Sequence, residues 1–247
     1  MIIGSNAAAI GASAVNVLVF GAYAELADAD CSICSILGTA ADATRGCIMS
    51  NAELPRTALE RGQVAPVKLA HIVRRTSRFA AMREWYQFVL QAEVVLQTDH
   101  FAFLTYDEEH HRVAILAEPG LVDPVANTAG TDHVAFTYKD LADLLFTYTR
   151  LAAEEIKPFW CINHGTTTSF YYRDPDGGAV ELQIDNFATV EETAQWFASG
   201  EFDKNPVGIV FDPDELIEKF ESGMPVSELT RRPPLPEGVT PFDMVRT

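Results

Sequence analysis

The sequence is poor in basic residues and has no long apolar run. Its 247 residues include 18 Lys+Arg against 35 Asp+Glu, which gives a formal net charge of −17. This surplus of negative charge repels phosphate backbones and anionic lipid, and so argues against nucleic acid and membrane surfaces as partners. No apolar stretch reaches the roughly 18 uninterrupted residues of a membrane-spanning helix, so none is predicted.

Cysteine is also scarce, with four residues at positions 31, 34, 47 and 161. Four unevenly spaced cysteines are too few for a disulfide scaffold in a chain of this size, and we therefore expect a reducing, cytoplasmic location. Cys31 and Cys34 form a C-x-x-C pair. Without a second pair of ligands this pair is only a weak indication of zinc binding.

The chain changes character near position 49. Residues 1–48 are rich in Ala, Gly, Ser and Cys and show no regular hydrophobic period, whereas the periodic pattern begins near Val67. We hypothesise that Met49 is the natural initiator and that residues 1–48 are an over-extended reading frame or a disordered leader. Residues 49–65 would then be an N-terminal arm, and N-terminal sequencing of the native protein tests this.

From Val67 onward, one order of elements occurs twice. Hydrophobic periodicity predicts two βαβββ modules, which can together close a sheet around a pocket. The predicted fold is α+β, with both modules in one open, barrel-like mixed sheet over residues 66–186, followed by an acidic helical tail over 187–247. The expected strands are 67–74, 94–98, 100–106, 112–117, 132–138, 157–161, 167–173 and 179–184, and the expected helices are 78–90, 139–154, 189–198 and 213–222.

Two histidines and one glutamate occupy first and last strands of these modules. His71 and His133, which are 62 residues apart, each fall within the first strand of a module, and Glu181 falls in the last strand. Polar and apolar residues alternate in that last strand, so one of its faces can line the cavity. Two imidazoles and one carboxylate are the ligands with which non-haem Fe(II) oxygenases hold their metal while leaving positions open. The sequence therefore predicts a metal site at His71, His133 and Glu181.

Five segments resemble the vicinal oxygen chelate superfamily, in particular its type I extradiol ring-cleaving dioxygenases. They are residues 70–72, 108–114, 132–136, 164–171 and 179–182. The resemblance implies Fe(II), with Mn(II) as an alternative, held by the three predicted ligands. It further implies O2 and a catechol-type diol such as 2,3-dihydroxybiphenyl as substrates, and a yellow muconic semialdehyde-type product. The larger members carry a second pair of modules, so this chain is similar to the small single-domain type.

The resemblance also implies roles for residues around the metal. His111 is expected beside the oxygen site as an acid or base, and His164 and Tyr171 are expected to hydrogen-bond the substrate oxygens. Phe103 and Phe170 are expected to line an aromatic pocket. Further aromatic candidates for this pocket are Phe101, Phe136, Phe159 and Trp160.

Two other functions stay open, because the same fold hosts several activities. A glyoxalase-like isomerase or lyase would use a fourth protein ligand, for which Glu118 is the conceivable residue. A metal-free protein that sequesters small molecules would not need the three ligands, and insensitivity to chelators would favour it. Exposed sheet edges and the acidic tail lead us to expect a homo-oligomer. Strand alternation also predicts that His110 points away from the face of its neighbour His111.

Overall fold

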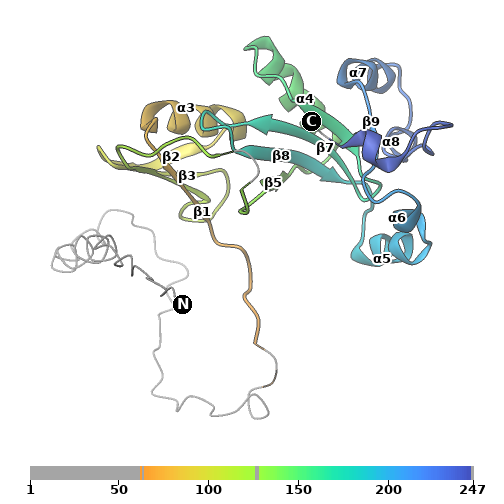
Figure 1. Ribbon diagram of the computed structural model, residues 1–247, viewed down its shortest axis with the longest axis horizontal. Coiled ribbons are helices and arrows are strands. Elements are labelled where there is room, and N and C mark those ends of the chain that lie inside the picture. Colours follow the sequence, from red (N-terminus) through yellow and green to blue (C-terminus); the bar gives the residue numbers. More distant parts are fainter. Residues whose placement is uncertain (1–61, 63, 126–127, 246–247) are drawn as a thin grey trace, which may run out of the picture. The chain divides into compact units, whose positions relative to one another are not determined.

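The computed structural model describes residues 62, 64–125 and 128–245 (Figure 1). The chain divides after residue 65, and the residues from Pro66 onward form one compact unit. The expectations about residues 1–48, including the initiator Met49 and the Cys31 and Cys34 pair, lie outside the described residues. No helix among the described residues is long and apolar enough to cross a membrane.

The first module has the predicted βαβββ order. Its strands pair in the order β1-β4-β3-β2, with β1 parallel to β4 and the other pairs antiparallel. This four-stranded sheet is called the first sheet. Its elements are β1 (Ile72–Thr76), α3 (Phe79–Leu90), β2 (Glu93–Gln97), β3 (Phe101–Thr105) and β4 (Val113–Ala117).

The second module repeats this topology, with β5 parallel to β8 and β8 antiparallel to β7. Its five strands form the second sheet in the order β5-β8-β7-β6-β9. The predicted repeat is therefore confirmed. The elements of this module are β5 (His133–Thr137), α4 (Leu141–Ala153), β6 (Trp160–Asn163), β7 (Thr167–Arg173) and β8 (Ala179–Asp185), and β9 (Ile209–Val210) comes from the C-terminal segment.

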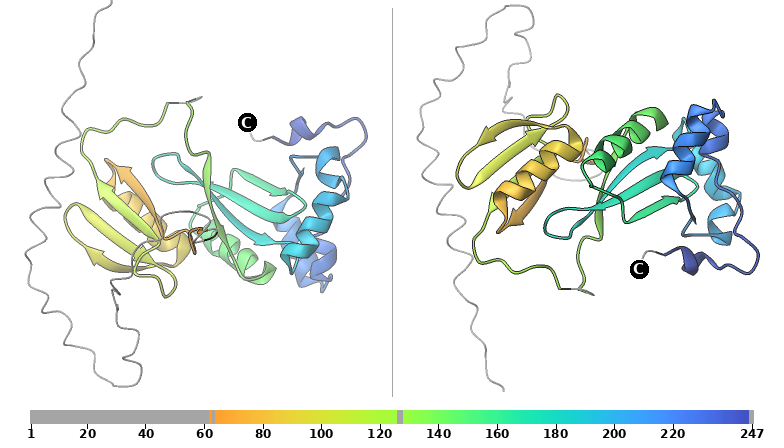
Figure 2. Two further views of the ribbon diagram at one scale, coloured as in Figure 1. Left: turned by 90° about the horizontal axis from the view of Figure 1, so that it is seen from below. Right: turned by 90° about the horizontal axis from the view of Figure 1, so that it is seen from above.

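The α+β fold class is confirmed, and the described strands form two sheets that do not close into one. Helices α3 and α4 lie side by side in the right-hand view of Figure 2. The Arg150 guanidinium of α4 donates hydrogen bonds to the carbonyls of Phe88 and Val89 of α3 at 2.8 and 3.0 Å. Both helices and one face of each sheet share a single hydrophobic core, with Leu104 from β3 and Leu182 from β8 fully buried in it.

A partly buried ion pair also joins the modules. Arg74 of β1 and Asp174, which follows β7, form an ion pair at 2.5 Å, and the side chain of Asp174 is fully buried. The Tyr86 hydroxyl of α3 donates to the same carboxylate at 3.1 Å. The turn between β7 and β8 is thereby held against the first module.

The C-terminal segment packs on the second sheet. Strand β9 pairs with β6, and the Trp160 indole donates to the Met244 carbonyl at 3.0 Å. Thr189 and Asp212 cap the two longer helices through their side chains, and these helices match the two predicted from the sequence. The elements of this segment, besides β9, are α5 (Val190–Ala198), α6 (Glu201–Lys204), α7 (Pro213–Glu221), α8 (Val226–Leu229) and a 3-10 turn, Pro241–Met244.

Strand β1 begins later than predicted, so His71 immediately precedes it instead of lying within it. The parallel partner β4 begins at Val113, opposite Ile72, and offers no strand residue to the chain before that point. The carbonyls of Leu69 and Ala70 accept hydrogen bonds from the Arg112 guanidinium at 2.8 and 3.1 Å instead. Hydrogen bonds from the Arg112 side chain thus take the place of the expected strand-to-strand hydrogen bonds.

Candidate active site

His133 and Glu181 meet on the second sheet. His133 is the first residue of β5, not a mid-strand residue as predicted, and Glu181 lies on the neighbouring strand β8. The imidazole Nε2 is 3.0 Å from Glu181 Oε2. Glu181 is 4% exposed and points away from the core, because its neighbours Val180 and Leu182 occupy the core face of β8.

Asp132, which the sequence analysis did not single out, orients His133. Its Oδ2 lies 2.6 Å from His133 Nδ1. A carboxylate that accepts the Nδ1 hydrogen selects the tautomer in which Nε2 has a lone pair. In that tautomer Nε2 and the Glu181 carboxylate are two acceptors facing each other, an arrangement that a shared cation or a second proton on the imidazole must satisfy. The adjacent Asp-His sequence is the signal that could have pointed to Asp132.

His164 and Tyr171 form a second pair on the same face. Tyr171 of β7 lies directly opposite Glu181 in the antiparallel register, and its hydroxyl is 3.1 Å from His164 Nε2. The other ring nitrogen, Nδ1, bonds to the carbonyl of Val207. Burial is the main cause of a lowered pKa at His164, which keeps this imidazole neutral near pH 7. The Trp160 ring lies 4.8 Å from that of Tyr171, measured between centroids.

The first sheet carries a separate group of imidazoles. The rings of His71 and His111 are 4.4 Å apart, and His111 stacks on Phe103 at 4.5 Å. His110 and His111 lie in the loop before β4, and their Nδ1 atoms are 2.6 Å apart. The expectation that these neighbours point to opposite faces is wrong, because a loop lacks the alternation of a strand. Burial, followed by the nearby His71, lowers the pKa of His111.

The three predicted metal ligands are not brought together in one chain. His71 lies with His111 on the first sheet, and His133 lies with Glu181 on the second. Over residues 62, 64–125 and 128–245, no group of three His, Cys, Asp or Glu side chains is placed to hold a metal ion. The donor types suit Fe(II), but a single chain assembles only two of the three donors.

Comparison with known proteins identifies the family. A model of the Glyoxalase/Bleomycin resistance protein/Dioxygenase superfamily matches residues 68–182. Two proteins of Rhodococcus globerulus, biphenyl-2,3-diol 1,2-dioxygenases 2 and 3, are each 47% identical to this chain over 167 residues, which is 67% of this chain and 88% of each relative. This chain belongs to that superfamily. The resemblance predicted from the sequence is thereby confirmed.

Among solved structures, a lactoylglutathione lyase from Agrobacterium tumefaciens matches 48% of this chain and 94% of its own at 22% identity, with a TM-score of 0.40. The residues matched by the superfamily model include all three predicted ligands, His71, His133 and Glu181.

Two further residues that the sequence suggested, Phe170 and Glu118, do not join the polar side chains gathered on the second sheet. Phe170 is fully buried in the core, where its ring lies 5.5 Å from that of Phe211, and alternation along β7 directs it to the face opposite Tyr171. This placement favours a core role over substrate contact. Glu118 follows β4, and Arg75 donates a hydrogen bond to its carboxylate at 3.1 Å.

Proposed function

We propose that this protein is a metal-dependent extradiol ring-cleaving dioxygenase. It would insert both atoms of O2 into a catechol-type diol such as 2,3-dihydroxybiphenyl, in the cytoplasmic catabolism of aromatic compounds. The observation that carries this proposal is the 47% identity to two biphenyl-2,3-diol 1,2-dioxygenases across 88% of their length. The polar groups gathered on the second sheet provide independent chemical support.

The proposed metal is Fe(II), with Mn(II) as the alternative, because imidazole and carboxylate donors suit both ions. When bound, such a metal brings a chelating diol and O2 into one coordination sphere. His133 and Glu181 are the donors that one chain supplies together, with Nε2 and Oε2 3.0 Å apart. Asp132 would hold the imidazole in the ligating tautomer.

Tyr171 and His164 would accept a proton from the diol. The Val207 carbonyl accepts the hydrogen of His164 Nδ1, so Nε2 of the neutral ring accepts the Tyr171 hydroxyl hydrogen. The lone pairs of the Tyr171 oxygen can then accept a hydrogen bond from a diol hydroxyl beside Glu181. A proton from the diol would pass through Tyr171 to His164, where a positioned base can hold it.

His111 is proposed as a second acid or base, near the oxygen site. Its pKa is lowered by burial and by the neighbouring imidazoles His71 and His110, so it is neutral and able to accept a proton at pH 7. Phe103 stacks on its ring and would fix its orientation.

An oxygen-uptake assay tests the function. The full chain would be loaded with Fe(II) without air and then mixed with air-saturated 2,3-dihydroxybiphenyl or catechol. We expect a yellow product and one O2 consumed per ring, both lost in Glu181→Gln. Asp185→Asn removes a carboxylate from the exposed end of the same face of β8 and should retain activity. Metal binding without oxygen uptake would contradict the proposal and favour an isomerase or lyase. Chelator-insensitive diol binding would favour a sequestering protein.

A further inference from the structure

One backbone carbonyl, that of Val207, determines where the His164 ring carries its proton. Nδ1 of the imidazole is hydrogen-bonded to this oxygen, and Nε2 is 3.1 Å from the Tyr171 hydroxyl. A carbonyl can only accept, so it keeps the proton of the neutral ring on Nδ1 and leaves a lone pair on Nε2. Val207 itself lies outside the helices and strands, in the loop between α6 and β9. The direction of its carbonyl therefore depends on the side chains that hold this loop.

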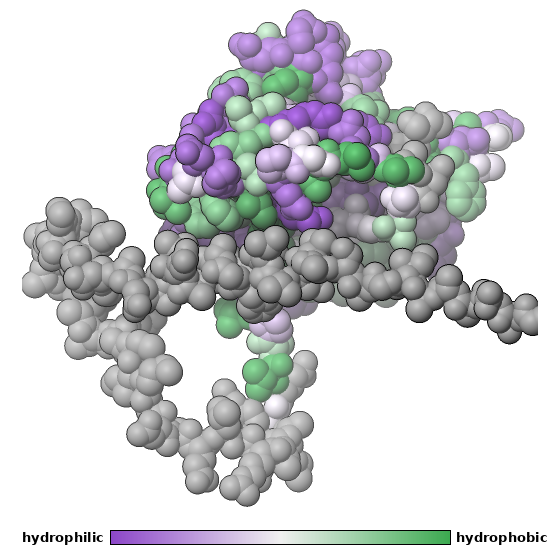
Figure 3. Space-filling model, turned by 60° about the vertical axis from the view of Figure 1, so that its left-hand side comes forward, coloured by the Kyte–Doolittle hydropathy of each residue, from purple (hydrophilic) through white to green (hydrophobic). Residues whose placement is uncertain are grey.

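Arg232 joins the loop to the backbone of His164. Charged side chains ordinarily lie at the protein surface, as the hydrophilic residues shown in Figure 3 do, but the Arg232 side chain is only 6% exposed. Its Nη1 donates to the carbonyls of Asn205 at 2.7 Å and of His164 at 3.2 Å. Its Nη2 donates to the Glu201 carbonyl at 2.8 Å, and Trp196 packs on the guanidinium. One guanidinium thus fixes the loop against the residue whose Nδ1 the loop contacts.

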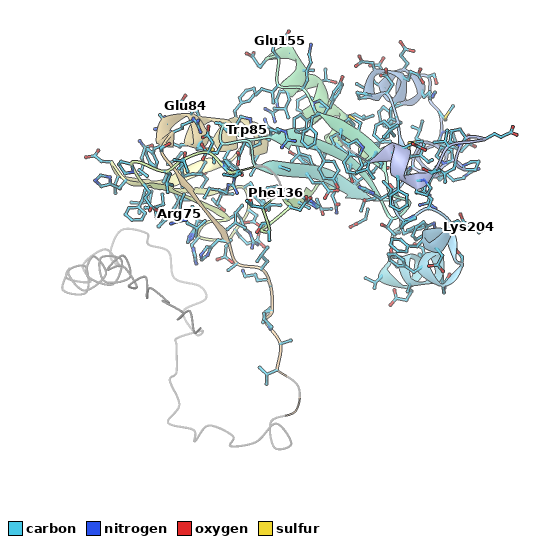
Figure 4. The ribbon with its side chains drawn as sticks, in the orientation of Figure 1. Arg75, Glu84, Trp85, Phe136, Glu155 and Lys204 are labelled. Atoms are coloured by element: carbon cyan, nitrogen blue, oxygen red, sulfur yellow. The ribbon has the colours of Figure 1, made fainter. Side chains whose placement is uncertain are left out.

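Asn205 holds the part of the loop that contains Val207. It follows α6, whose last residue, Lys204, is labelled in Figure 4, and it is 4% exposed. Its Oδ1 accepts hydrogen bonds from the backbone N–H groups of Val207 at 3.1 Å and of Gly208 at 2.9 Å. Its Nδ2 donates to the Gly208 carbonyl at 2.8 Å. The side-chain amide therefore bonds to the loop through both its oxygen and its nitrogen.

The planarity of the peptide bond turns this contact into a direction for the carbonyl. The Gly208 N–H and the Val207 C=O belong to one trans peptide group, in which they point in opposite directions. Asn205 holds the N–H edge of this group, so the C=O edge points away from Asn205, and His164 Nδ1 lies there. Rotation of the peptide group would break the bond to Asn205 and remove the acceptor from His164.

We propose that Asn205 is a positioning residue for ring cleavage and that Arg232 supports it in this role. Together they fix the Val207 carbonyl, and through it the tautomer in which Nε2 of His164 can take a proton. Neither residue lies within residues 68–182, which the superfamily model matches. The inference rests on the proposed function, because that function requires a lone pair on Nε2 of His164.

A purely structural role for Asn205 is the competing explanation. Asn205 would then stabilise the loop without affecting the imidazole, and its loss would lower stability alone. In the proposed role, loss of Asn205 lets the Val207 carbonyl turn away, so that the His164 proton can move to Nε2. That nitrogen would then face the Tyr171 hydroxyl as a donor and could no longer accept a proton. The tautomer of His164 therefore distinguishes the two roles.

Nuclear magnetic resonance measures this tautomer without any catalytic turnover. The full chain, with isotope-labelled histidines and no added metal, would be studied at about pH 8.5, where histidine is neutral. Long-range proton–nitrogen correlations distinguish a ring protonated on Nδ1 from one protonated on Nε2, and His164→Asn assigns the signals. We expect only the Nδ1–H form in the wild-type protein and a mixture with the Nε2–H form in Asn205→Ala.

Asn186→Ala is the matched control. The Asn186 side chain donates to the Gly165 carbonyl at 3.0 Å and accepts from the Thr168 hydroxyl at 2.8 Å, so this substitution also removes hydrogen bonds of a side-chain amide. Neither bond holds the Val207 peptide group. Asn186→Ala should therefore lose stability and keep the Nδ1–H form. A ring that stays wholly in the Nδ1–H form in Asn205→Ala, or an equal change in both variants, would overturn the proposal.

Arg232→Lys covers the case in which Asn205→Ala does not fold. Lysine keeps the positive charge but lacks the planar fork that joins the carbonyls of His164, Asn205 and Glu201. The tautomer should therefore shift in the same direction in this variant. If Asn205→Ala does not fold, a wild-type tautomer in Arg232→Lys would overturn the proposal.

Oxygen uptake gives a second readout and separates this inference from the function. In Asn205→Ala, kcat for ring cleavage should fall roughly 10–100-fold with little change in KM, as for loss of other outer hydrogen-bond partners. In Asn186→Ala, kcat should stay near the wild-type value. A shifted tautomer in a protein that cleaves no diol would keep the positioning role and contradict dioxygenase activity. Ring cleavage with an unshifted tautomer in Asn205→Ala would do the reverse.

Discussion

His164, in the turn between β6 and β7, contacts Tyr171 of β7, with Nε2 of the imidazole 3.1 Å from the phenol oxygen. The Val207 carbonyl, which can only accept, places the proton of the neutral ring on Nδ1. Tyr171 in turn lies opposite Glu181 in the strand register. A chain of proton-bearing groups therefore runs from Tyr171, beside Glu181, through His164 to the Val207 carbonyl.

Removal of the phenol oxygen tests this chain of groups. In Tyr171→Phe, the proton of the diol loses its route to His164, and kcat should fall by roughly 100-fold or more with a small change in KM. Tyr172→Phe is the matched control, because Tyr172 is the next residue of β7 and is buried on the core face. Steady-state oxygen uptake measures both variants, and equal losses would contradict a role for the Tyr171 hydroxyl.

The stability of the protein should fall with acidification through His164. Burial lowers the pKa of this imidazole in the folded state, whereas the same imidazole in the unfolded chain has a pKa of about 6.5. Below that pH the unfolded state binds the proton first, so stability is complete above about pH 6.5 and declines as the pH falls toward the folded-state pKa. Urea unfolding as a function of pH should show this slope, and His164→Asn should reduce it.

His100→Asn serves as the control for this slope. His100 lies exposed before β3, and its substitution should leave the pH dependence of unfolding unchanged. A slope that persists in His164→Asn would assign the acid sensitivity to another group.

The module repeat could be predicted because each of its strands and helices shows its own hydrophobic period in the sequence. Strand β7 has the predicted bounds, Thr167–Arg173, and Tyr171 and Glu181 share a face as alternation requires. The separation of His71 from Glu181 could not be predicted in this way. It depends on which sheet faces the two helices cover, and periodicity shows that a face is apolar without showing what covers it. The hydrogen bonds from the Arg112 guanidinium, which take the place of strand pairing before β1, could not be predicted either. Such a tertiary contact leaves no periodic pattern in the sequence.

The Asp132 carboxylate should strengthen metal binding through His133. In Asp132→Asn the imidazole loses a charged acceptor that lies 2.6 Å from Nδ1, and Mn(II) affinity should weaken roughly 10–100-fold. Asp185→Asn, on the same sheet face, should bind with nearly the wild-type affinity. Metal titration compares the two, and unchanged affinity in Asp132→Asn would show that the carboxylate does not orient the ligand.

The Asp174 carboxylate should be a main support of the joined modules. Asp174→Ala leaves Arg74 without its partner, removes the acceptor of Tyr86, and should lower the free energy of unfolding by about 3 kcal/mol or more. Lys219→Ala breaks an exposed pair with Glu215 and should cost less than about 1 kcal/mol. Urea denaturation measures both, and equal costs would contradict a structural role for the Arg74–Asp174 pair.

Gly165, next to His164, should tolerate no side chain. Its φ is +98°, and an added Cβ would lie 2.2 Å from the Trp196 ring. Gly223 has a similar φ of +85° with open space around it, so Gly223→Ala should cost only the left-handed strain of about 1–2 kcal/mol. Gly165→Ala should cost a further 1–3 kcal/mol or so from overpacking against Trp196. Trp196 also packs under Arg232, which donates a hydrogen bond to the His164 carbonyl. Gly165→Ala should therefore lose ring cleavage as well as thermal stability. Equal unfolding temperatures for the two alanine variants would contradict the clash.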